Sequence, residues 1–431
     1  MATSYAAYSV YYYESDPPYA GHGMAGRILD AGASFVVAYP GLQSGLNGDP
    51  KVEGFTDAGN ALRLAVTDYV TGSAQPVYIY DPVTPANLAT PTWTNVQNLY
   101  TLVRLGNYLY ALDFDNARIV EINPASTPTG YAATGVTFTL PGSLVPTTPS
   151  GLTAHGQALA VIGGKLYGLF TFTDSAWANY GKSLLVRFDV TGGSSISIDS
   201  SNGNFAENAF SLADKGSEVY VAAIGGAQGS SGTPNANSRV QKISIAGALN
   251  TASVTDVLTQ SDFAYEYRDI SFDAGGNAYV LMGTYNSSWN LVGQLLKIAN
   301  LATPGTHAVI DTFSTTPGYF WSAQYTADNN RIWFARGNAI RVYDASSFTT
   351  PAATLTLSVN GPGNLGGLLG SGDLYDNIND LTYIGATGTR ASLRGYRSPL
   401  QVSNTPRAHA ARALTRGRPE LTEDELEQLD D

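Results

Sequence analysis

The sequence contains no cysteine, few lysines and no long apolar run, and each absence excludes a class of protein. Without cysteine there are no disulfides, no thiolate metal sites and no cysteine nucleophile. Only 6 of the 23 basic residues are lysine, the net charge is −12, and residues 1–398 contain no basic stripe for nucleic acid. No stretch approaches ~18 consecutive apolar residues, so no membrane span is predicted.

Motifs of common catalytic and metal sites are missing as well. There is no Gly-x-Ser-x-Gly elbow, no phosphate-binding loop and no His-Glu-x-x-His. The histidines lack the spacing of a zinc or redox-metal site, so no metal and no cofactor is predicted. Calcium is the one alternative, because Asp373, Asp376 and Asp380 in SGDLYDNINDL supply the oxygen ligands it prefers. Such Asp and Asn clusters are equally typical of turns.

What the chain does contain is a repeat of strand-like segments, each with a central aromatic residue or leucine. The intervals between these signature residues run from 46 to 59 residues. Each signature follows a turn and precedes a loop and a second strand, as in GNYLYALDFDNARIVEIN (106–123). A period of this length, written in short strands and Gly/Asn turns, is typical of a β-propeller. The signature residues are Leu64, Tyr110, Tyr167, Tyr220, Tyr279, Trp333 and Tyr383.

Seven repeats predict an all-β fold, a seven-bladed β-propeller closed into one ring, with six or eight blades as alternatives because the first and last repeats are faint. Gly-Gly, Gly-Asn and Asn-Asn pairs supply the positive φ angles that tight hairpins need. The N-terminal runs YSVYYY (8–13) and SFVVAY (34–39) also look like strands. One of them is predicted to complete the last blade and latch the ring, which removes free sheet edges.

Over roughly residues 40–398 the repeats resemble the broad group of seven-bladed propellers that includes the YVTN and NHL families. Asp81, Asp189 and Asp344 at strand ends are a faint echo of the Trp-Asp ending of WD repeats, which itself is absent. The resemblance implies a scaffold that binds a ligand or a protein, often outside the cytoplasm, and it carries no catalytic residue over.

Residues 1–398 are predicted to form the propeller, and 399–431 a tail of different character. The tail is basic up to Arg418 and acidic after it. Thr422 and Glu425 have the spacing of a capping box, which predicts a short helix from about residue 422. So short a helix needs a surface to dock on. The tail therefore either docks a partner, packs on its own propeller or frays in solvent.

Ligands are expected where loops enter the innermost strands, and the repeat predicts which residues ring that entrance. Twelve positions before the signatures lie Val52, Asn98, His155, Asn208, Tyr267, Trp321 and Ser371. Stacking aromatics beside amide and carboxylate groups suit sugars or peptides. The alternative is that strand starts facing a wet channel are simply polar. The predicted ligand-binding residues are Asn98, His155, Asn208, Glu266, Tyr267, Arg268, Asp269 and Trp321.

A second aromatic set lies in longer hairpin loops, with Trp177 and Tyr180 in one loop and Tyr285 and Trp289 in another. By repeat equivalence these loops share one face. Exposed aromatics there would make a binding surface, and the alternative is that they pack over loop backbone.

The leading hypothesis is a non-catalytic binding scaffold, exported or on the cell surface, for a protein or glycan partner. The composition, rich in Gly, Ser, Thr, Asn and Tyr, favours an extracellular, periplasmic or cell-surface location with any leader absent from this chain, and the cytoplasm is the alternative. One rival is a glycosidase or lyase that uses Glu207, Glu266 or Asp269 with His155. The other is a structural component of a surface assembly.

Overall fold

The computed structural model describes the backbone of residues 4–384, apart from several short segments. The segments left out are 14–20, 31–34, 47–49, 58, 60, 69–73, 85–86, 95, 124–129, 230–231, 288–290, 314–319, 328, 337–338 and 357–373. The predicted tail, 399–431, and its expected helix from 422 therefore lie outside the described residues. Within them the structure contains only strands and three short 3-10 helices, which confirms the all-β prediction.

The strands form six four-stranded sheets and one five-stranded sheet in the described part of the chain. The sheet nearest the termini has β1 (Ser4–Tyr13), β2 (Gly21–Asp30), β3 (Phe35–Leu46) and β29 (Leu374–Ile384). The five-stranded sheet has β4 (Val52–Thr56), β5 (Leu62–Thr67), β6 (Gln75–Tyr80), β7 (Asn87–Ala89) and β8 (Thr92–Trp93). Next come β9 (Leu99–Leu105), β10 (Tyr108–Asp113), β11 (Arg118–Asn123) and β12 (Ala132–Thr139).

The remaining sheets follow the same four-strand pattern. They are β13 (Thr153–Ile162), β14 (Lys165–Thr173), β15 (Tyr180–Thr191) and β16 (Ser195–Glu207), then β17 (Ala209–Lys215), β18 (Glu218–Ala223), β19 (Arg239–Ser244) and β20 (Thr255–Thr259). The last two are β21 (Glu266–Phe272), β22 (Ala278–Tyr285), β23 (Leu291–Ile298) and β24 (His307–Phe313), and β25 (Phe320–Thr326), β26 (Arg331–Arg336), β27 (Ala339–Asp344) and β28 (Ala353–Thr356). The 3-10 helices are η2 (Gly142–Leu144), η3 (Leu249–Thr251) and η4 (Gln260–Asp262).

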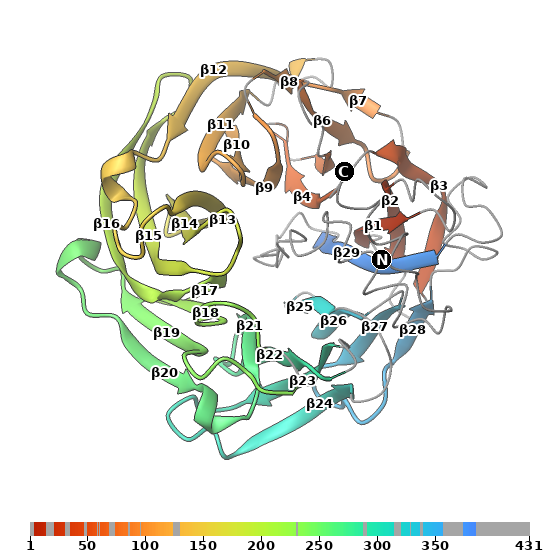
Figure 1. Cartoon of the computed structure of the whole chain (residues 1–431). Helices are drawn as coiled ribbons and strands as arrows, with labels where there is room; N and C mark the ends of the chain where they lie inside the picture. Colours follow the sequence, from red (N-terminus) through yellow and green to blue (C-terminus); the bar gives the residue numbers. More distant parts are fainter. Residues whose placement is uncertain are drawn as a thin grey trace, which may run out of the picture.

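Figure 1 shows these sheets as blades around a ring, with β4, β9, β13, β17, β21, β25 and β29 nearest the centre. Neighbouring strands in each blade are antiparallel. This arrangement confirms the predicted propeller. We call the face where the innermost strands begin the upper face. The opposite face, where each innermost strand turns into the second strand, is the lower face.

The ring is closed by strands from both ends of the described chain. β29 pairs with β1 and so becomes the innermost strand of a blade whose other strands are β1, β2 and β3. Both N-terminal runs expected to be strands lie in this blade, within β1 and β3, and the intervening β2 joins them. Tyr383 consequently lies in an innermost strand, whereas the other signature residues lie in second strands. The last repeat was therefore out of register with the rest.

The core of the molecule consists of apolar layers between adjacent blades. The six signature residues in second strands, Leu64 through Trp333, are all at least 95% buried. The four tyrosines pack in the wedge between their own blade and the next one, as Tyr110 does with Leu166 and Phe170. Leu64 instead packs against the preceding blade. Full burial of a side chain of this size stabilises the fold by roughly 1.5–3 kcal/mol. The regular spacing of the four tyrosines therefore reflects one packing position repeated around the ring.

Turns between the innermost and second strands use the residues that the sequence predicted. The backbone is left-handed at Gly106, Gly164, Gly216, Gly276 and Asn330, with φ between 51° and 81°. These positions need residues without a bulky side chain near the backbone, because left-handed φ is strained for most others. No helix among the described residues is long and apolar enough to cross a membrane.

The latch strand is predicted to be essential for stability. Leu381 of β29 is fully buried, and its carbonyl accepts a hydrogen bond from Gln324 Nε2 at 2.9 Å. We expect Leu381→Ala to lower the free energy of unfolding by about 2–5 kcal/mol in urea titrations. The control is Val309→Ala at a 44% exposed position, where about 0.5 kcal/mol or less is expected. Equal effects of the two substitutions would show that closure by β29 contributes little.

Candidate functional site

The upper face carries the starts of the innermost strands, as the repeat predicted. Val52, His155, Tyr267 and Trp321 lie within the first three residues of β4, β13, β21 and β25. Asn98 and Asn208 directly precede β9 and β17. Ser371 lies outside the described residues. The predicted positions are thus at the right end of the right strands.

Five innermost strands have a β-bulge near their start. Each bulge changes which residue of that strand corresponds to a given residue in the other blades. Each bulge leaves one residue without a partner on the second strand, because the pairing register skips it. A bulge redirects the side chain of the extra residue. In four of the blades, the bulged residue lies one or two positions after the residue that the spacing predicted for the channel entrance. The bulged residues are Tyr100, Gln157, Phe210, Arg268 and Trp321.

An aromatic stack runs across the upper face between two blades. The Phe114 ring lies 4.9 Å from that of Tyr100 and 4.8 Å from that of His155, and His155 lies 4.8 Å from Trp177. At the inner end, Lys51 Nζ lies 4.7 Å from the centre of the Tyr100 ring, at cation–π distance. Only Trp177 is partly exposed in this stack. It therefore presents the solvent side of a rigid aromatic column.

The loop that carries Trp177 holds it in an unusual conformation. Trp177 has φ of +56°, a left-handed value that is a genuine outlier for a bulky residue. The Asp174 carboxylate maintains the loop by accepting from the Ala178 amide at 2.9 Å and from Asn179 Nδ2 at 2.6 Å. Strain of this kind costs on the order of 1–3 kcal/mol and is concentrated at functional sites.

Two of the predicted residues, Asn98 and His155, meet at this stack. The Phe114 amide donates to the Asn98 carbonyl at 2.7 Å, and the Gly156 amide donates to the Phe114 carbonyl at 2.9 Å. Asn98 Oδ1 and His155 Nδ1 are buried, and neither has a hydrogen-bond partner among the residues that the structure describes. Burial lowers the pKa of His155 to about 4, so its imidazole is neutral at pH 7. Unsatisfied buried polar atoms are unusual and indicate a missing partner.

Glu266 and Arg268 form a different cluster, two blades further around the ring. Glu266 Oε2 accepts from Arg268 Nη2 at 3.1 Å, and both side chains are fully buried. Glu266 Oε1 accepts from the backbone amides of Gly229 and Asn235, at 2.5 Å and 3.0 Å. The guanidinium lies between the rings of Phe210 and Tyr285, at 5.9 Å and 5.8 Å. This pair therefore anchors the long β18–β19 loop to the ring.

Burial raises the pKa of Glu266, and the charge of Arg268 and the two amides oppose this shift. Burial also raises the pKa of Glu207, and Lys182 opposes it. Asn208 has φ of +52° and donates from Nδ2 to the Gly226 carbonyl at 2.7 Å. Asparagine is among the few residues that adopt this conformation readily, so Asn208 has a clear role in shaping the loop.

The other predicted residues lie apart from both clusters. Tyr267 is fully buried in the layer between two blades, and its hydroxyl donates to the Thr259 carbonyl at 2.7 Å. Asp269 is also buried and lines a cavity at the lower face. Only the backbone of Trp321 is described. Tyr180 and Tyr285 are half-buried and buried, and Trp289 lies outside the described residues.

The structure does not test the calcium hypothesis. Asp376 and Asp380 lie in β29, where only their backbone is described, and Asp373 lies outside the described residues. No group of three or more His, Cys, Asp or Glu side chains that could hold a metal ion occurs in the part of the chain that is described.

Comparisons with known proteins identify the fold and no family. No protein-family model matches the chain, and no curated protein sequence matches it. A "putative 6-phosphogluconolactonase" from Bacteroides uniformis is 12% identical and has a TM-score of 0.53, over 89% of this chain and 100% of that one. A protein from Lactobacillus plantarum has the same identity and TM-score, over 82% of this chain and 97% of that one. At this identity the likeness shows a propeller fold alone.

The bulged residues, Phe114 and the loop partners of Glu266 are what sequence reasoning missed. No residue type marks the bulge, because Tyr, Gln, Phe, Arg and Trp all occupy it. Phe114 follows a strand and resembles an ordinary hairpin residue. Its place beside His155 depends on pairing between blades, which spacing along one repeat does not describe.

The buried Glu266–Arg268 pair is expected to be structural. Glu266→Gln leaves the buried Arg268 charge without its counterion, so we expect a loss of about 3–5 kcal/mol in the free energy of unfolding. Glu218→Gln is the control, because Glu218 pairs with Lys242 at 2.6 Å at a partly exposed position. That change is expected to cost about 1 kcal/mol or less in the same urea titration. Similar losses would mean that the pair is not an anchor.

Asp269 is expected to make stability depend on pH. Burial raises its pKa to about 8, above its value in the unfolded chain, so the folded state holds its proton more tightly. Stability from this group is complete at acid pH and decreases as pH rises towards 8, by at most ~1.4 kcal/mol per pH unit. Asp269→Asn should therefore gain stability relative to the parent protein between pH 5 and pH 8, measured by urea unfolding at each pH.

Asp273→Asn is the control for that experiment. Burial raises the pKa of Asp273, but hydrogen bonds from Asn277 outweigh it and the net pKa is lowered. Asp273 therefore stabilises the fold throughout pH 5–8, and its replacement should give a difference that does not change with pH. A flat profile for Asp269→Asn as well would contradict the raised pKa.

Proposed function

We propose that this protein is a non-catalytic binding scaffold that holds a glycan on its upper face, with Trp177 as the stacking platform. The observation that carries the proposal is the strained, half-exposed Trp177 above His155 and Phe114. A rigid indole held by buried aromatics offers a flat apolar surface without losing further side-chain entropy on binding. Such a surface suits the C–H face of a sugar ring.

The polar atoms beside the stack support a sugar as the ligand. Asn98 Oδ1 can accept a hydrogen bond from a hydroxyl, and the neutral His155 can accept or donate at its ring nitrogen. A binding site that combines apolar walls with a few directed polar groups is typical of small-molecule and glycan recognition.

The acidic residues predicted for catalysis make structural hydrogen bonds or lie at the opposite face, and this supports a binding role over a catalytic one. Glu266 accepts hydrogen bonds from Arg268 and two loop amides, and Asp269 lines a cavity at the opposite face. His155, the proposed catalytic partner, has its pKa lowered to about 4 by burial. A glycosidase would need two carboxyl groups about 5–10 Å apart across one sugar.

We also propose a location outside the cytoplasm, on the basis of composition.

The test is a glycan array followed by calorimetry with the strongest glycan. Trp177→Ala is expected to weaken binding by at least about tenfold, because stacking on an aromatic platform is worth on the order of 1–3 kcal/mol. Trp177→Phe should restore part of the affinity. Phe348→Ala, which removes a half-buried aromatic at a lower-face turn, should leave binding unchanged.

Three outcomes would overturn the proposal. Failure of every glycan to bind would exclude a glycan scaffold and leave a protein partner, to be sought with the same three variants. Equal affinity of Trp177→Ala and the parent protein would exclude the platform. Release of cleaved sugar during calorimetry would show that the protein is an enzyme.

A further inference from the structure

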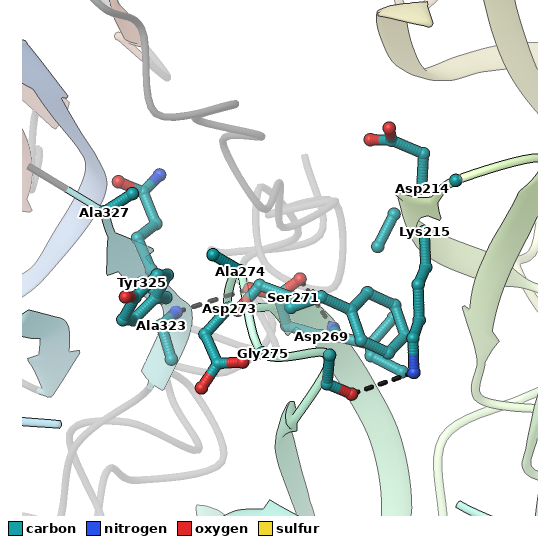
Figure 2. A pocket seen from close by; sticks show the side chains of 16 residues that line it. Asp214, Lys215, Asp269, Ser271, Asp273, Ala274, Gly275, Ala323, Tyr325 and Ala327 are labelled. Atoms are coloured by element: carbon teal, nitrogen blue, oxygen red, sulfur yellow. Dashed lines mark hydrogen bonds between the residues drawn. The ribbon is translucent and has the colours of Figure 1, made fainter. Parts of the chain in front are cut away.

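A cavity of about 520 Å³ opens at the lower face, away from the aromatic stack. It lies between the ends of the innermost strands β17, β21 and β25 and the turns that follow them. Figure 2 shows Asp269, Ser271 and Ala323 together in this cavity, with Lys215 at one side. Its size is within the range of about 300–1,000 Å³ typical of small-molecule sites.

The interior of the cavity carries hydrogen-bond acceptors that lack partners. Ser271 Oγ and Gln324 Oε1 are buried, and neither has a hydrogen-bond partner within the described part of the chain. The orientation of the Gln324 amide is determined by its Nε2, which donates to the Leu381 carbonyl at 2.9 Å. Gln324 is only 3% exposed. Both atoms therefore indicate a ligand that donates hydrogen bonds.

Asp269 is the buried acid of the cavity. Its two oxygens accept from the backbone amides of Ile270, at 2.9 Å, and Ala323, at 3.3 Å, and the Ser211 hydroxyl also lies close to them. A carboxylate has about four acceptor positions, so these three donors do not use all of them. No cationic side chain pairs with Asp269 among the described residues, which leaves a buried acid without a counterion. Burying such a group is costly unless a cation or proton compensates it.

Aromatic rings form two walls of the cavity. Phe272 and Tyr325 both line it, and Tyr325 is held against Tyr279 in a stack at 5.4 Å. Lys215, the one basic residue of the lining, already donates to the Gly276 carbonyl at 2.9 Å and lies 5.4 Å from the Phe272 ring. Aromatic faces attract cations and pack well against apolar groups.

The buried acid, the hydrogen-bond acceptors and the aromatic walls together indicate the charge and chemical class of the ligand. The lining includes the carboxyl groups of Asp214, Asp269 and Asp273, but no group of three or more His, Cys, Asp or Glu side chains in the described structure is placed to hold a metal ion. An anion would meet the acceptors and carboxylates of the lining. An organic cation fits every part of the lining, since its N–H groups can donate to the acceptors and its apolar part can pack against the aromatic walls.

We propose that this lower-face cavity binds a small organic ammonium ion, with Asp269 as counterion and Ser271 and Gln324 as hydrogen-bond acceptors. The site is separate from Trp177 and does not depend on the function proposed for the upper face. The raised pKa of Asp269 is consistent with it, because an empty cavity leaves this acid without a compensating charge.

The test uses benzylammonium chloride and benzyl alcohol as probes, with binding to the full chain measured by ligand-observed NMR. Near pH 8, the pKa of Asp269, the ammonium ion is expected to bind at least about tenfold more tightly than the alcohol. Asp269→Asn should abolish that preference, and Ser271→Ala should weaken ammonium binding about threefold. Asp256→Asn, at an outer strand that pairs with Arg239, should change neither value.

Several results would overturn the proposal. One is equal binding of the two probes, and another is an ammonium preference that persists in a folded Asp269→Asn protein. Saturable binding of calcium chloride that Asp269→Asn abolishes would make the cavity a metal site instead. Binding of neither probe to the parent protein would exclude the site. Loss of ammonium binding in Trp177→Ala as well would show that the two faces are not separate.

Discussion

Closure of the ring depends on the hydrogen bonds between β1 and β29, strands from opposite ends of the described chain. Every other blade is built from consecutive strands and could form locally. The latch blade forms only when both ends meet, so its formation must offset the loop-closure entropy of nearly the whole chain. Once it forms, the apolar layer on each side of this blade is covered by a neighbouring blade. The wedge packing of Tyr110, Tyr167 and their equivalents therefore requires the latch.

The closed ring explains why charged groups can be buried at its centre. Five innermost strands bulge near the upper face, each in a different blade. Arg268 is fully buried because Glu266 neutralises it and two aromatic rings cover it. In an open sheet the same pair would face solvent and contribute little. The same closure leaves Asp269, three residues along β21 from Glu266, without a cationic partner in the described structure.

Much of the fold could be predicted from sequence, because the signature residues and turns are set by local and repeated constraints. A buried wedge residue and a left-handed turn recur in each blade, and each requires particular residue types. The latch was only partly predicted. Tyr383 continues the spacing of the signatures, yet it belongs to an innermost strand, since the last blade takes its remaining strands from the N-terminus.

The candidate sites could be predicted less well, for a physical reason. Spacing located the starts of the innermost strands, and Asn98 and His155 lie there beside the aromatic stack. It could not anticipate bulges, which shift the equivalence by one or two residues without a sequence signal. Nor could it separate Glu266 from Asp269, which are close in sequence but belong to opposite faces. That separation depends on the length of the strand between them.

The upper face and the lower cavity have different polar groups that are not paired within the described structure. The upper face has an aromatic stack with one exposed ring and two polar atoms without partners, Asn98 Oδ1 and His155 Nδ1. The lower cavity has a buried acid and two acceptors, Ser271 Oγ and Gln324 Oε1. Unsatisfied polar groups cost free energy in the folded state unless a ligand pairs with them. β21 contributes Glu266 and Arg268 near the upper face and Asp269 to the lower cavity, so ligands at the two faces would contact different side chains of the same strand.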